Sequence, residues 1–142
     1  MVMQNVDINY WAVLISAVIS MIIGWLWYSP FIFGNLWMKL SGITEKSHDK
    51  MKKDGKIGKL FLWSFIFTLI SMYVLAYFVK YVSAVSFVDG MQLGFLAWLG
   101  FMVPLVLNDS LWGGKSLKLF LINAGHHLIA IIITAGILAV WS

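Results

Sequence analysis

The residues of this sequence that could do chemistry in an apolar setting gather in its last third. Segment 119–140 reads LFLINAGHHLIAIIITAGILAV, so an asparagine and two histidines stand in a run long enough to span a membrane. An asparagine and an aspartate close the preceding apolar run. Ionisable groups inside membrane segments are by default candidates for titration or ligand binding. The candidate polar cluster therefore comprises Asn108, Asp109, Asn123, His126 and His127.

The two histidines of this cluster point in different directions on a helix, because successive residues are ~100° apart. His127 shares a face with Asn123 and Thr134, which predicts that it points toward the neighbouring helices. His126 shares a face with several isoleucines, which predicts contact with lipid or with a second protein surface. Asp109 is the nearest carboxylate by topology, so an Asp109–His127 contact is expected.

Three roles stay open for the cluster: a structural histidine that bridges helices, a titrating or ligand-binding site, and catalysis. In the catalytic role His127 would be the base, Asp109 would orient it and Ser110 would be the nucleophile. No Gly-x-Ser-x-Gly, His-Glu-x-x-His or glycine-rich phosphate loop is present, so the sequence favours a non-enzymatic protein without assigned catalytic residues.

No metal or cofactor site is expected from this sequence. Adjacent histidines diverge on a helix, and the histidines here are not spaced i and i+4. Cysteine is absent, which excludes disulfides and thiolate ligands within the chain.

The overall composition predicts an all-α integral membrane protein. Of the 142 residues, 61% are hydrophobic and only 11% charged, with a mean hydropathy of +0.89. Four apolar runs are long enough to cross the roughly 30 Å of a bilayer's hydrocarbon core. We therefore expect a single transmembrane domain over residues 1–142, built as a four-transmembrane-helix bundle. The predicted spans cover residues 10–28, 60–79, 88–107 and 119–141.

Two further elements are predicted between the first and second spans. Pro30 ends the first span, because the residue before a proline is pushed out of the helical region. Residues 31–43 place aromatic and leucine side chains on one side of a short helix, which is typical of an interfacial amphipathic helix. Residues 44–59 are polar and predict a lysine-rich cytoplasmic loop, mobile or partly helical. Its contacts with anionic headgroups would involve Lys50, Lys52, Lys53 and Lys56.

The distribution of lysine predicts the orientation in the cytoplasmic membrane. All ten basic residues are lysines, and seven of them lie between the first two spans. Lysines in short loops stay on the cytoplasmic side, so both termini are predicted outside. The first ten residues lack the positive region of a cleavable signal peptide, so the first span is expected to be retained. Nucleic acid is not an expected partner.

Small residues define the faces that the helices would use for packing. In lipid, helices associate through close contacts of small residues and through side-chain hydrogen bonds. A hydroxyl stripe in the second span (Ser64, Thr68, Ser71) can also bond its own helix carbonyls. The predicted packing residues are Ala12, Ser16, Ser20 and Gly24 in the first span, and Gly90 and Gly94 in the third.

Two segments of the chain resemble each other. Residues 24–39 and 100–115 both run through a glycine, a hydrophobic patch, a proline, Leu-Trp and a lysine, and each precedes a further span. The pattern fits a duplicated two-span unit, and it fits shared interfacial chemistry equally well.

The chain as a whole resembles a bacterial family of small membrane proteins, the domain of unknown function 1761. The resemblance spans nearly all of the sequence and implies a four-span fold in a bacterial cytoplasmic membrane, without an assigned reaction. The family commonly has an aromatic residue where this chain has His126, which implies a local or structural role for that histidine. The most specific pieces are Asn9 with Trp11; Gly24, Trp27, Tyr28, Ser29 and Pro30 with Gly34 and Trp37; and Trp98, Gly100 and Phe101.

The sequence thus favours a non-enzymatic membrane module. We expect an oligomeric bundle that passes or senses a small solute, or an accessory subunit of a membrane complex. Its expected partners are the lipid bilayer and either further copies of itself or another membrane protein. The alternatives are an intramembrane enzyme that uses the His/Asp cluster at the cytoplasmic side, and a protein that binds anionic lipid.

Overall fold

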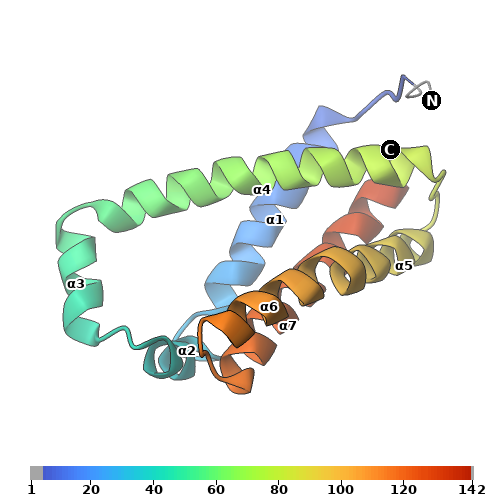
Figure 1. The fold of residues 1–142 in the computed structure, drawn as a ribbon. Helices are drawn as coiled ribbons and strands as arrows, with labels where there is room; N and C mark the ends of the chain where they lie inside the picture. Colours follow the sequence, from blue (N-terminus) through green and yellow to red (C-terminus); the bar gives the residue numbers. More distant parts are fainter. Residues whose placement is uncertain (1–4, 142) are drawn as a thin grey trace.

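The computed structural model describes residues 5–141, which form helices joined by short turns and contain no strand (Figure 1). Four segments are long and apolar enough to cross a membrane: α1, α4, the continuous run from α5 through η1 to α6, and α7. The predicted all-helical architecture with four apolar helices is therefore confirmed for the residues described. The elements are α1 (Tyr10–Trp27), α2 (Gly34–Ser41), α3 (Glu45–Lys53), α4 (Lys56–Tyr81), α5 (Phe87–Ala97), η1 (Trp98–Met102), α6 (Val103–Trp112) and α7 (Leu117–Val140).

Side-chain caps fix where the long helices begin. The Asn9 side chain accepts hydrogen bonds from the first-turn amides of α1, and Ser116 accepts one from the Leu119 amide of α7. Ser86 and Asp89 form a capping box at the start of α5. α4 starts at Lys56 rather than at residue 60, because lysine is a good helix former and Gly55, with φ 71°, turns the chain just before it.

The lysine-rich segment 44–59 is mostly helical. Thr44 and Ser47 form a capping box that starts α3, which runs to Lys53 and leaves all its residues exposed or half-buried. After a two-residue turn the chain continues into α4. The segment therefore forms a helical elbow between α2 and α4.

The third apolar segment changes its helical winding in the middle. The Val103 N–H bonds the Trp98 carbonyl, five residues back, which makes a π-turn over η1. Pro104 follows and has no N–H, so an α-helix would leave the Gly100 carbonyl without its usual donor. The wider turn accommodates the proline without ending the span.

Helix α7 lies at the centre of the packing. It contacts α1 along its length, it contacts α4 and α5 in its second half, and it contacts α2, η1 and α6 nearer its start (Figure 1). Its closest neighbour is α5, which approaches through Gly90 and Gly94. A methyl group at Gly94 would lie 2.8 Å from the Ile131 carbonyl oxygen, and one at Gly90 would lie 2.8 Å from the Gly136 Cα. Only glycine permits these backbones to come so close.

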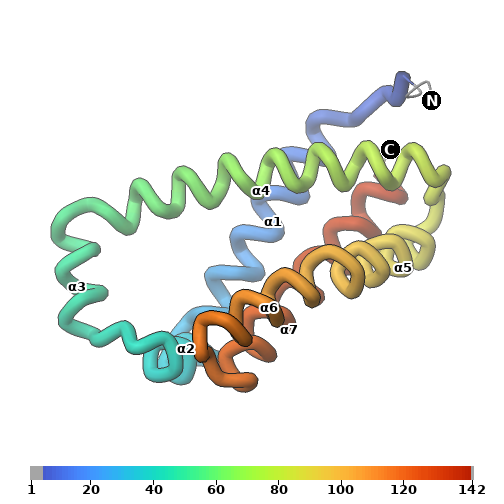
Figure 2. Tube along the Cα trace, viewed as in Figure 1, coloured from blue at the N-terminus to red at the C-terminus, as the bar shows by residue number. Residues whose placement is uncertain are grey.

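The hydrophobic core is confined to one part of the molecule. It joins the first half of α1, the second half of α4 and the end of α7, with Ala12, Ala17, Val79 and Ala135 among its most buried members. The start of α4 diverges from α1 and α2, and α3 connects α2 to it (Figure 2).

We predict that Gly90→Ala lowers the free energy of unfolding by about 1–3 kcal/mol, the usual cost of overpacking. The added methyl group has backbone atoms of α7 as neighbours, and these cannot move aside independently. Reversible unfolding in detergent micelles, followed by circular dichroism, measures the change.

Gly100→Ala is the matched control, because a methyl group there would have nothing within 4 Å. This variant is expected to keep the wild-type stability or exceed it slightly. Equal losses in the two variants would contradict the close approach of α5 and α7.

Candidate functional site

The polar part of α7 is tied to the end of α1. The Tyr28 hydroxyl donates a hydrogen bond of 2.7 Å to the Asn123 Oδ1. Tyr28 caps the C-terminal end of α1, and Asn123 lies two turns into α7, so the bond joins segments 95 residues apart in the sequence. A phenol donor and an amide acceptor satisfy one another here, between apolar helices.

Two tryptophans bind the backbone of the same stretch of α7. The Trp27 Nε1 donates to the Ile122 carbonyl at 2.9 Å, and the Trp98 Nε1 donates to the Ala124 carbonyl at 2.8 Å. A helix carbonyl has a second lone pair, so it accepts an indole N–H in addition to its backbone partner. Gly125 makes room for this contact, because a methyl group there would lie 3.1 Å from the Trp27 ring.

His126 packs against α1, so the prediction that it faces lipid or a second protein was wrong. Its ring centroid lies 5.2 Å from that of Tyr28, and a methyl group at Gly24 would lie 3.1 Å from its Nε2. Both ring nitrogens are inaccessible to solvent and have no hydrogen-bond partner among the described residues. The reason is that α7 is central, so the side on which Ile122 and His126 lie is covered by α1.

His127 is half-buried beside His126, with their ring centroids 5.0 Å apart. The predicted Asp109–His127 contact does not form in the described structure. Asp109 instead pairs with the Lys115 Nζ at 2.9 Å, and its side chain is 72% exposed. The turn after α6 causes this, because the Lys115 N–H bonds the Ser110 carbonyl and folds the lysine back toward the aspartate.

The candidate polar cluster therefore divides between two helices. Asn123, His126 and His127 lie together on α7, whereas Asn108 and Asp109 lie exposed on α6. Ser110, the residue after the ion-paired Asp109, is buried. Among residues 5–141, no three histidine, aspartate or glutamate side chains gather closely enough to hold a metal ion.

The small and hydroxyl residues fall into two groups. Ala12 and Ser16 are fully buried, whereas Ser20 and Gly24 are half-buried. The hydroxyls in α4 bond their own helix: Thr68 donates to the Ser64 carbonyl at 2.7 Å, and Ser71 donates to the Phe67 carbonyl at 3.1 Å. Thr134 in α7 does the same with the Ala130 carbonyl at 2.7 Å.

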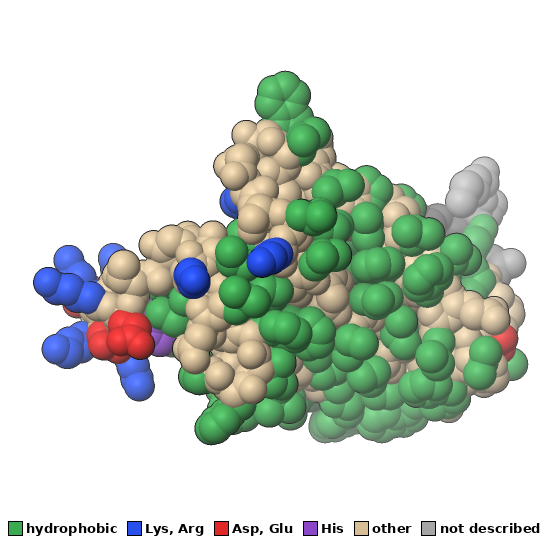
Figure 3. All heavy atoms as spheres, turned by 90° about the horizontal axis from the view of Figure 1, so that it is seen from below, with side chains coloured by type: hydrophobic (Ala, Val, Ile, Leu, Met, Phe, Trp, Pro, Cys, Tyr) green, Lys and Arg blue, Asp and Glu red, His purple; other side chains and the backbone are tan. Residues whose placement is uncertain are grey.

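The lysines predicted to meet lipid headgroups are all exposed. Lys50, Lys52 and Lys53 lie in the last turn of α3, and Lys56 begins α4. Figure 3 shows a group of basic side chains projecting from one end of the molecule and others nearer its middle, while hydrophobic side chains cover much of the rest of that face.

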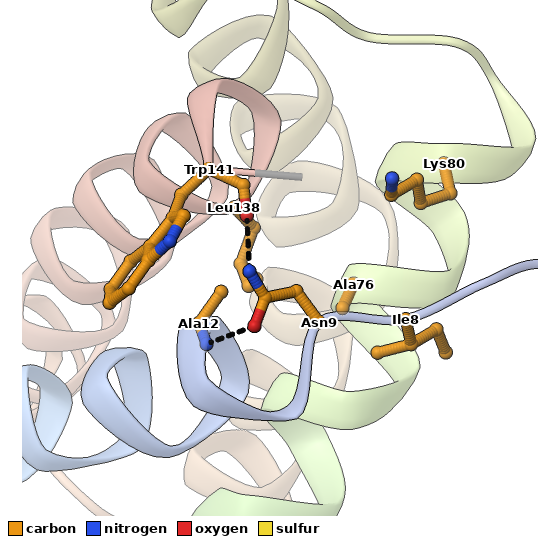
Figure 4. Close-up of a pocket in the computed structure, with 7 residues that line it drawn as sticks. All are labelled: Ile8, Asn9, Ala12, Ala76, Lys80, Leu138 and Trp141. Atoms are coloured by element: carbon orange, nitrogen blue, oxygen red, sulfur yellow. Dashed lines mark hydrogen bonds between the residues drawn. The ribbon is translucent and has the colours of Figure 1, made fainter.

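A small cavity of about 10 Å³ lies at the opposite end of the bundle, near the start of α1. Asn9, Lys80 and Trp141 line it together with apolar side chains (Figure 4). The Asn9 Nδ2 donates to the Trp141 carbonyl at 3.4 Å. This volume is close to the minimum that holds one water molecule.

Sequence reasoning missed the partners of the α7 stretch. The sequence pattern assigned no acceptor to Trp27, Tyr28 or Trp98. The available signal was chemical, because a buried indole or phenol normally finds an acceptor. The sequence alone does not say which carbonyl that is.

A family model described as "Protein of unknown function (DUF1761)" covers residues 11–139. Neither a curated protein nor a solved structure matches the chain.

We predict that His126→Leu raises the free energy of unfolding by about 1 kcal/mol, because it removes two buried nitrogens that no described group satisfies. Unfolding in detergent micelles measures the change. A marked loss of stability in His126→Leu would show that the imidazole is bonded.

Tyr28→Phe, by contrast, is expected to lower the free energy of unfolding by about 0.6 kcal/mol through loss of the bond to Asn123. Unfolding in matched micelles measures this change as well.

Proposed function

The chain belongs to the DUF1761 family of proteins of unknown function, and from this premise we propose a role that is argued from the geometry of this chain alone. We propose that it is a multi-pass protein of the cytoplasmic membrane, with both termini outside the cytoplasm. In this proposal it is a non-enzymatic module that associates with a second copy of itself.

Membrane insertion is supported by the four apolar helices and by where their side chains lie. Large hydrophobic residues are exposed along every one of these helices. In α6, for example, Leu105 is 70% exposed and Leu111 is 77% exposed. Patches of this extent are a liability in water and are ordinary against lipid tails. The proposal also places α2 at the membrane interface, since α2 links the first span to the helical elbow formed by residues 44–59.

The orientation follows from the lysines. The exposed lysines of α3 and the first turn of α4 lie at one end of the bundle, and basic residues in short loops remain cytoplasmic. A reporter enzyme that folds only outside the cytoplasm is expected to be active when fused after residue 142. Activity of a cytoplasm-specific reporter at the same position would contradict the orientation.

The non-enzymatic role depends on one observation: the polar groups around Asn123 are engaged in contacts between helices. Tyr28, Trp27 and Trp98 all donate to this stretch of α7. Asp109, the carboxylate that a catalytic pair would need, is held by Lys115 on the surface. These bonds stabilise the packing of α1, α5 and α7, and they support a structural use of the cluster over catalysis or solute passage.

Self-association is supported by Gln92 on the outer surface of α5. Gln92 lies about 7.5 Å along the helix axis from the first residue of α5. Its side chain is exposed and has no hydrogen bond within the described chain. It lines an open groove of about 530 Å³ whose other walls are the apolar side chains of α5 together with Ile132. An amide is both donor and acceptor, so two copies related by a twofold axis can satisfy each other's glutamine.

We predict that Gln92→Leu weakens self-association by about 1 kcal/mol, because two symmetry-related amide bonds are worth ~0.6 kcal/mol each. Sedimentation equilibrium in detergent micelles measures the dimer constant. The matched control is Leu121→Ala, since Leu121 is exposed on α7 outside the groove. A monomeric wild type, or a Gln92→Leu variant that dimerises as strongly as the wild type, would contradict the proposal.

A further inference from the structure

The beginning of the apolar run in α4 is exposed on every side, whereas Phe65 and Leu69 further along it pack against the core. Four consecutive residues, Leu60, Phe61, Leu62 and Trp63, are between 50% and 59% exposed. Because successive helical residues are ~100° apart, these four point in all directions around the helix axis. α4 contacts α1 and α7, but its buried residues begin only at Met72.

The surfaces near this half of α4 are equally uncovered. Ile22 and Leu26 in the second half of α1 are 51% and 47% exposed, and α6 exposes most of its leucines. Figure 1 shows α4 diverging from these helices toward its start, with α3 bridging the gap. The exposed fractions show that the described chain leaves Leu60 to Trp63 of α4, and Ile22 and Leu26 of α1, largely uncovered.

The walls of this opening require an apolar neighbour. Thr68 and Ser71 already donate to carbonyls of α4, so their hydroxyls need no external acceptor. The remaining side chains from Leu60 to Ile70 are mainly leucine, isoleucine, phenylalanine and tryptophan. An occupant with hydrogen-bonding groups would find few partners here, whereas an acyl chain needs none.

The mouth of the opening carries positive charge. Between Glu45 and Lys59 the chain has six lysines and three acidic residues. Lys56 and Lys59 stand in the first turn of α4, directly before the apolar run, and that turn has no acidic residue. No ion pair joins these lysines to an acidic residue of the described chain. The charge is therefore free to attract an anion.

We propose that an anionic phospholipid binds along the first half of α4. Its acyl chains lie against the apolar side chains from Leu60 to Ile70, and its phosphate lies at Lys56 and Lys59. The adjoining lysines of α3 add to the attraction, because basic residues near a membrane surface favour anionic headgroups. The inference rests on the membrane insertion proposed above and is independent of self-association through Gln92.

Photocrosslinking tests this site. The full chain is reconstituted into phosphatidylcholine vesicles that contain a trace of phosphatidylglycerol with a photoreactive acyl chain. We expect labelled peptides from residues 60–71, and we expect unlabelled phosphatidylglycerol to suppress the labelling while added phosphatidylcholine does not. Equal suppression by the two lipids, or labelling that spares residues 60–71, would overturn the proposal.

The charge contribution is tested with paired variants. Lys56→Gln with Lys59→Gln is expected to lower the labelling at least about tenfold, since each lysine near the surface contributes roughly fivefold. Lys115→Gln with Lys118→Gln removes the same charge at the turn between α6 and α7 and is expected to leave the labelling unchanged. Equal losses in the two pairs would overturn the site.

Carbonate extraction of the same vesicles separates this inference from the proposed function. A chain that resists extraction but shows no preference for phosphatidylglycerol overturns the lipid site alone. A chain that carbonate releases overturns both the lipid site and the membrane insertion on which it rests.

Discussion

Hydrogen-bond donors between apolar helices need acceptors, and the backbone of α7 provides them. Trp27 of α1 and Trp98 of η1 donate to carbonyls of this helix, and Tyr28 bonds the Asn123 side chain between those two points. In a hydrocarbon solvent no water would replace such a bond once it opened. The constraint therefore fixes how α1 and the α5–η1 segment pack on α7, and it makes α7 the centre of the fold.

This constraint divides the molecule into a tight part and an open part. α1, α5 and α7 are held by the indole bonds and by glycines that bring the backbones together. α4 is held most tightly in its second half, where Met72, Leu75 and Val79 are buried. Phe65 still packs on the core, but the start of the helix, up to Trp63, diverges from the bundle and is joined to it through α3. An open half of a helix is unfavourable in water but acceptable in lipid, where the tails solvate it.

Hydropathy was sufficient to place the four long helices, because this signal is local in sequence. The contacts of the polar residues could not be predicted in the same way. His126 shares a face with isoleucines, yet it lies against Gly24, because α7 has protein on more than one side. Asp109 pairs with Lys115 because a short turn brings the lysine back to it, which spacing on a helix does not reveal. The π-turn before Pro104 is likewise a response of the backbone to one residue.

Scanning a single spin label through α4 and α7 in bilayers tests this division most directly, and the absence of cysteine makes the labelling specific. For residues 60–64 the division predicts high accessibility to oxygen at every position, with protection from a water-soluble nickel complex. For residues 124–135 it predicts accessibility to oxygen that rises and falls with the helical period. Access of the nickel complex to residues 60–64, or a single protected face among them, would contradict a start of α4 surrounded by lipid.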